Sequence, residues 1–168
     1  MLVVTGIILF GCAENPALIG INEEVSGSPE SEETQLVSKP PSVDIYNVEG
    51  STFVVLDVYC WKEESLCSIE PNEPEELLYG KPPLQTRPGQ GISLLLSTDS
   101  IPETDHIYFP DEMELIQMKL GERKEVEIDD GVIIAPMEPG RYYYSLKLQW
   151  DGELQGQAYY VFGVNVRE

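Results

Sequence analysis

The C-terminal third of the chain alternates between apolar and polar residues with a period of two. Over residues 141–150 the apolar positions are Tyr142, Tyr144, Leu146, Leu148 and Trp150. Residues 158–166 repeat the alternation, with Tyr160 and Phe162 in phase. This pattern is typical of β-strands with one buried face, so we expect these aromatic side chains in a core. Asp151-Gly152 stands between the two runs and predicts a two-residue type I′ hairpin.

Shorter runs predict six further strands, at residues 43–48, 52–61, 92–97, 114–119, 122–128 and 132–135. The run at 52–61 is apolar on both faces apart from Asp57, which favours a central strand. Turn sequences separate the runs, among them Glu49-Gly50, Pro88-Gly89, Asp130-Gly131 and Pro139-Gly140.

One helical turn is expected near 74–79, where Pro74 opens the segment, two glutamates follow it and Gly80 ends it. Strands at regular spacing without a long helical pattern predict an all-β fold. The fold class is therefore an immunoglobulin-like antiparallel β-sandwich with a short helical turn near 74–79.

The N-terminus has a different character. Residues 1–12 are uncharged and mostly apolar, too short to span a bilayer but of the length of a signal-peptide core. Residues 13–41 contain six glutamates against Lys39 and no aromatic residue, a composition that predicts a disordered tether. A cleaved secretory signal or a buried first strand are the alternatives for the apolar run.

The stretch Leu9-Phe10-Gly11-Cys12 resembles the lipobox of bacterial lipoproteins. The resemblance implies a signal segment at 1–11 and a lipid on Cys12 at the mature N-terminus. An acidic tether at 12–41 and a β-sandwich domain at 42–168 would follow. It also implies an extracytoplasmic location, with the membrane bound through the lipid anchor, since two acyl chains anchor a protein stably.

Thirty acidic residues against ten basic ones give a net charge of −20. This balance argues against a nucleic acid partner, because phosphate binding needs clusters of Lys and Arg. It also argues against docking of the folded part on anionic lipid head groups. We expect any partner to be cationic or neutral.

Cys60 and Cys67 form an even pair once Cys12 is set aside. In an exported chain such a pair predicts a disulfide, and closing a loop of this length would stabilise the fold by about 2–3 kcal/mol. A metal site would need two more ligands, and the single histidine, His106, is distant in sequence.

Three elements together resemble a module of secreted lipoproteins of Gram-positive bacteria. They are Val58-Tyr59-Cys60-Trp61, Cys67, and the run from Glu73 to Leu78. The resemblance continues through Lys81-Pro82-Pro83 and into the two terminal strands. It implies export, the disulfide and the fold, but it assigns no catalytic residue.

Candidate chemistry is sparse. His106 has acidic neighbours but no nucleophile motif or zinc-binding pattern accompanies it. The acidic clusters around Asp105, Asp111 and Asp129 could offer oxygen ligands to Ca²⁺, yet none follows the EF-hand pattern, and solvated loops are the simpler interpretation. We therefore expect no catalytic residue, no metal and no cofactor.

A binding surface is predicted around Trp61, Tyr143 and Tyr159, the two tyrosines pairing across neighbouring strands. The function that these features favour is a lipid-anchored, extracytoplasmic, non-enzymatic module that binds an unknown envelope protein or ligand. One alternative is a sensor or accessory domain in cell-envelope stress or antibiotic response. Another is an envelope-polymer hydrolase that uses paired carboxylates.

Overall fold

The computed structural model describes residues 39–61 and 69–168. Its elements are β1 (Ser42–Asn47), β2 (Gly50–Phe53), β3 (Val55–Trp61), α1 (Pro74–Leu77), β4 (Leu84–Thr86), β5 (Gly91–Ser97), the 3₁₀ helix η1 (Asp105–Tyr108), β6 (Glu112–Lys119), β7 (Glu122–Glu125), β8 (Val132–Ile134), β9 (Gly140–Asp151) and β10 (Gln155–Val166). The predicted strands are present with shifted ends, except that the run at 52–61 is divided between β2 and β3, and β4 and η1 were not predicted.

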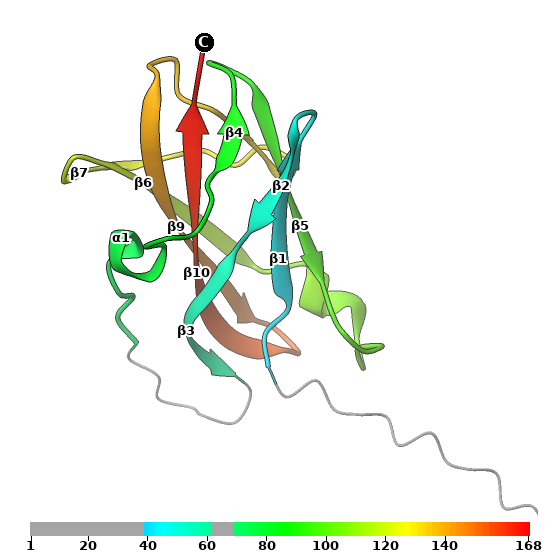
Figure 1. Cartoon of the computed structure of the whole chain (residues 1–168). Helices are drawn as coiled ribbons and strands as arrows, with labels where there is room; N and C mark the ends of the chain where they lie inside the picture. Colours follow the sequence, from blue (N-terminus) through cyan, green and yellow to red (C-terminus); the bar gives the residue numbers. More distant parts are fainter. Residues whose placement is uncertain (1–38, 62–68) are drawn as a thin grey trace, which may run out of the picture. The chain divides into compact units, whose positions relative to one another are not determined.

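The strands form two facing sheets, as Figure 1 shows. Sheet A has the order β2-β1-β5-β8, and sheet B has the order β3-β10-β9-β6-β7. The pairings are antiparallel except that β4 runs parallel to β10. In the immunoglobulin fold, strands A, B and E are neighbours in one sheet, and strands C, F and G are neighbours in the other. Here β1, β5 and β8 correspond to A, B and E, and β6, β9 and β10 correspond to C, F and G. The all-β sandwich predicted from the sequence is confirmed.

The core lies between the sheets and is rich in aromatic side chains. Tyr144 and Phe162 stack with ring centroids 4.9 Å apart, and Trp61 meets Trp150 edge-on at 5.0 Å. Tyr142, Tyr160 and the inward leucines of β9 are also buried. The alternating pattern thus identified the core face of β9 correctly, and such rings contribute more than their buried area alone.

A tyrosine corner closes the connection from β8 to β9. The hydroxyl of Tyr142 donates to the carbonyl of Glu138 at 2.8 Å and accepts from the ammonium of Lys119 at 2.9 Å. This feature belongs to the start of strand F in immunoglobulin-like sandwiches. The hydrogen bonds to Tyr142 and Glu138 raise the pKa of Lys119.

The prediction of one central strand at 52–61 is wrong. The chain leaves sheet A after β2, passes Val54 and enters sheet B as β3. Both segments lie at the end of their sheet's order, and β3 is only half-buried over most of its length. The run is apolar on both faces apart from Asp57 because its first part, β2, belongs to sheet A and its second part, β3, belongs to sheet B.

The two-residue hairpin predicted at Asp151-Gly152 is also wrong. Asp151 pairs with Gln155, which leaves three residues in the loop. The carboxylate of Asp111 accepts a hydrogen bond from the Asp151 backbone at 2.8 Å and holds the strand end in register. Two-residue turns with positive φ at both positions occur instead at Leu120-Gly121 and at Asp130-Gly131, the second of which the sequence marked as a turn.

The helical turn forms where it was predicted. Pro74 occupies the first turn, and Glu75 and Glu76 follow it near the positive end of the helix dipole. Gly80 has a φ of 74°, a left-handed conformation that glycine adopts without strain. Figure 1 shows α1 beside sheet B, on the side away from sheet A, and α1 contacts β9 and β10.

The start of the domain is tied to both sheets. The buried hydroxyl of Tyr160, on β10, donates to the carbonyl of Pro41, just before β1. Lys39 forms an ion pair with Asp99 at 2.8 Å, which lowers the pKa of the Asp99 carboxyl.

Residues 1–38, with Cys12 and the predicted signal and tether, lie outside the described residues. Within residues 39–61 and 69–168, no helix is long and apolar enough to cross a membrane.

Candidate functional site

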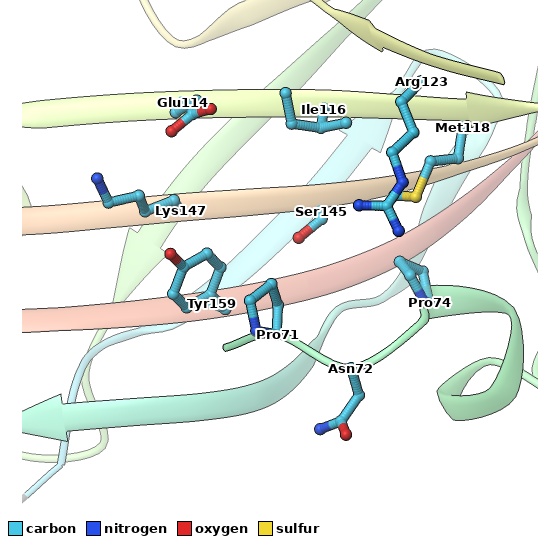
Figure 2. Close-up of a pocket in the computed structure, with 10 residues that line it drawn as sticks. All are labelled: Pro71, Asn72, Pro74, Glu114, Ile116, Met118, Arg123, Ser145, Lys147 and Tyr159. Carbon is cyan, nitrogen blue, oxygen red and sulfur yellow. The ribbon is translucent and has the colours of Figure 1, made fainter. Parts of the chain in front are cut away.

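The outer face of sheet B contains a hollow because a small residue stands between larger ones. Ile116 on β6 is directly opposite Ser145 on β9, and Ser145 is opposite Val161 on β10. All three point away from the core. Val161 is nevertheless fully buried. Residues 69–74 are here called the strap, and Figure 2 shows its residues Pro71, Asn72 and Pro74 beside this part of the sheet. The helix α1 contacts β9 and β10.

The strap is attached at two successive residues. The carboxylate of Asp57, on β3, accepts hydrogen bonds from the backbone and the side-chain amide of Asn72, at 2.8 and 2.6 Å. On the other side, Glu73 forms an ion pair with Arg123 on β7. Pro74 is buried and begins α1. The strap is therefore held from both edges of sheet B.

The space between the strap and β6 is a pocket with a volume of about 200 Å³. Figure 2 shows Ser145 and Ile116 in its middle, Glu114, Lys147 and Tyr159 toward one end, and Arg123 and Met118 toward the other. Its lining residues are Pro71, Asn72, Pro74, Glu114, Ile116, Met118, Arg123, Ser145, Lys147 and Tyr159.

The polar groups of the pocket are only partly used by the protein. Glu114 and Lys147 are cross-strand neighbours, and the Lys147 ammonium lies 3.5 Å from Glu112. Among the residues that the structure describes, neither the Ser145 hydroxyl nor the Glu114 carboxylate has a hydrogen-bond partner. The pocket can therefore accommodate apolar atoms in its middle and form hydrogen bonds at one end.

The described residues that line this pocket include neither histidine nor cysteine. Glu114 is the one carboxylate among the described lining residues, so these residues do not supply the acidic pair that the hydrolase hypothesis needs. The lining is suited to binding.

The predicted surface residues lie in three different places. Tyr159 lines the pocket. Tyr143 lies on the same outer face but stands opposite Gly163, whereas Tyr159 stands opposite Lys147. The expected cross-strand tyrosine pair is thus wrong, because Tyr159 lies four residues along β10 from Gly163, the partner of Tyr143. Arg141 instead covers the Tyr143 ring at 5.2 Å.

Trp61 is a core residue with 7% of its surface exposed. Its ring lies against Gly156, where an added Cβ atom would come within 2.4 Å of the indole. Cys60 next to it is buried, but Cys67 lies outside the described residues, so the disulfide stays a prediction.

The remaining candidate residues, His106 and the acidic clusters, do not form a common site among the described residues. His106 is in η1, with its side chain 57% exposed and Nδ1 3.7 Å from a carboxylate oxygen of Glu153. In the described ranges, no group of three or more histidine, cysteine, aspartate or glutamate residues is arranged to hold a metal ion.

Sequence reasoning missed the residues that shape the pocket. Arg123 and Asn72 carry no recognisable motif. Asp57 did give a signal, as the one polar residue in an otherwise apolar run. A carboxylate at such a position needs a hydrogen-bonding partner, which the structure identifies as Asn72.

Fold and site together define an immunoglobulin-like sandwich with a strapped pocket on one sheet. Comparison with protein-family models, curated proteins and solved structures finds no match.

Proposed function

We propose that this chain is a lipid-anchored, extracytoplasmic, non-enzymatic binding module and that the strapped pocket is its ligand site. The observation that carries the proposal is a pocket preformed between a sheet and a strap held on both sides. A cavity held in this way can take a ligand at a small entropic cost, because little of the protein needs to become ordered on binding.

The pocket favours an apolar side chain of a partner protein. Its volume of about 200 Å³ is below the roughly 300–1,000 Å³ of drug-sized ligand sites. Ile116, Met118 and two prolines offer apolar contacts, whereas Tyr159 is the one aromatic side chain among the described lining residues. A sugar would be favoured by more than one aromatic face.

An NMR titration with N-acetyl-leucinamide tests the site. We expect saturable shifts of the Ile116 and Ser145 amide signals. Ser145→Leu fills the hollow and should abolish them, whereas the matched variant Ser93→Leu, on the outer face of sheet A, should keep them. Stronger shifts with N-acetylglucosamine, or unchanged binding in Ser145→Leu, would contradict the proposed site.

The anchor is tested separately by intact-mass analysis of the protein extracted from membranes of its native host. We expect a diacylglycerol adduct on an N-terminal Cys12, and loss of the adduct and of membrane association in Cys12→Ala. Alkylation only after reduction would show the Cys60–Cys67 bridge in the same sample. An unmodified Cys12 in the membrane-extracted protein would refute the anchor and leave the pocket test unaffected.

A further inference from the structure

A second concave surface lies on the open side of the sandwich, where β6 and β7 line it with residues that alternate with those lining the strapped pocket. Here β7 is the last strand of sheet B and β8 the last strand of sheet A. A groove with a volume of about 780 Å³ lies along this side and is lined by residues from β6, β7 and residues 134–138. Several residues of an extended peptide would fit in a space of this size.

The floor of the groove is apolar and open to solvent. Ile134 is 61% exposed and Met137 is 73% exposed, although both are large apolar side chains. Val126, Ala135 and Pro136 complete the apolar lining. Exposed apolar side chains that share one groove mark a surface suited to a partner.

The rim of the groove is acidic. Glu122, Glu125, Glu127 and Glu138 line it, against Lys119 and Lys124. The Lys119 ammonium is already held by Glu138 and Tyr142. The groove therefore presents an excess of carboxylates to its occupant.

The edge of β8 offers backbone groups in the same place. Ala135 donates its backbone N–H to Gln90, and Gly131 accepts from Leu94, so these residues face the β5 side. Because hydrogen-bonded and non-hydrogen-bonded pairs alternate along an antiparallel ladder, the N–H and C=O of Ile134 point away from β5, toward the free edge. An extended peptide could pair with them.

We propose that this groove binds an extended, basic and apolar segment of another protein. Basic side chains would pair with the glutamates of the rim, apolar ones would cover Ile134 and Met137, and the backbone would pair with Ile134. A second copy of this chain or its own N-terminal segment fits poorly, since the chain carries −20 and residues 13–41 hold six glutamates against one lysine.

The test uses the lipid-free full domain and a labelled, blocked peptide in which Lys and Val alternate. We expect saturable binding by fluorescence anisotropy that weakens with added salt, and no binding of the matching Glu–Val peptide. Ile134→Lys and the double variant Glu125→Gln/Glu127→Gln should each weaken binding at least about tenfold.

Three controls make the outcome decisive. Leu95→Lys changes another exposed apolar residue of sheet A, and Glu75→Gln/Glu76→Gln removes two exposed charges on α1; both should bind like the parent chain. Ser145→Leu should also bind normally, which separates this groove from the strapped pocket. Equal loss in the Glu75/Glu76 variant, loss in Ser145→Leu, or unchanged binding in a folded Ile134→Lys would overturn the proposal.

Discussion

The carboxylate of Asp57 accepts two hydrogen bonds from Asn72, one from its backbone N–H and one from its side-chain amide. The two residues are 15 positions apart and belong to an edge strand and to an irregular segment. This single contact joins the strap to β3 and so helps to form one wall of the strapped pocket.

Asp57→Ala should loosen the strap and destabilise the domain by about 1–2 kcal/mol, because two hydrogen bonds to a charged group are lost at a partly exposed site. Chemical denaturation measures this loss. A double-mutant cycle with Asn72→Ala should give a coupling energy of at least about 0.5 kcal/mol. Additive effects of the two substitutions would mean that the contact contributes nothing to stability.

Tyr142→Phe should lower the free energy of unfolding by about 1–1.5 kcal/mol, since it removes the donor to Glu138 and the acceptor for Lys119 without changing the ring. Tyr79→Phe is the matched control, because Tyr79 is 91% exposed and should change stability by less than about 0.5 kcal/mol. Equal unfolding midpoints for Tyr142→Phe and the parent chain would show that the tyrosine corner does not stabilise this sandwich.

Leu120→Asn should stabilise the protein by about 0.5–1 kcal/mol. Leu120 has a φ of 52° at the β6–β7 turn, a left-handed conformation that strains a leucine. Its side chain is 92% exposed, so buried contacts do not offset this strain. Asparagine tolerates this conformation better. Val48→Asn is the control, as an equally exposed turn residue without a positive φ. A thermal melt compares the two, and equal shifts would contradict the backbone explanation.

Alkaline pH should destabilise the fold through two buried tyrosines. Burial raises the pKa of Tyr144 and of Tyr160 above the ordinary value of 10.0. Both stay neutral in the folded protein while the unfolded chain ionises. Their contribution is fully present below pH 10 and is lost as the pH rises above it, by about 1.4 kcal/mol per pH unit for each residue.

Denaturation at several pH values between about 9 and 12 checks this expectation. Tyr144→Phe and Tyr160→Phe should each make the loss of stability less steep. Tyrosinate absorbance of the folded protein should show these two hydroxyls ionising only with unfolding. A slope equal to that of the parent chain in both variants would contradict the assignment.

Several features of this protein follow from local sequence. The alternation in 141–150 and 158–166 predicts β9, β10 and the aromatic core, because a strand places every second side chain on the same face. Pro74 and Gly80 mark the helical turn through the backbone angles that they permit. The excess of acidic residues by itself narrows the range of partners, since it disfavours polyanions.

Other features depend on contacts between residues distant in the chain, which no local pattern records. The division of 52–61 between two sheets, the Asp57–Asn72 contact and the separation of Tyr143 from Tyr159 are of this kind. Sequence alone determined most of the strands and the buried faces of β9 and β10, since these follow from periodicity. Only the tertiary structure decided which strands pair, in which register, and hence where the pocket and the groove lie, because pairing is selected by the packing of the whole domain.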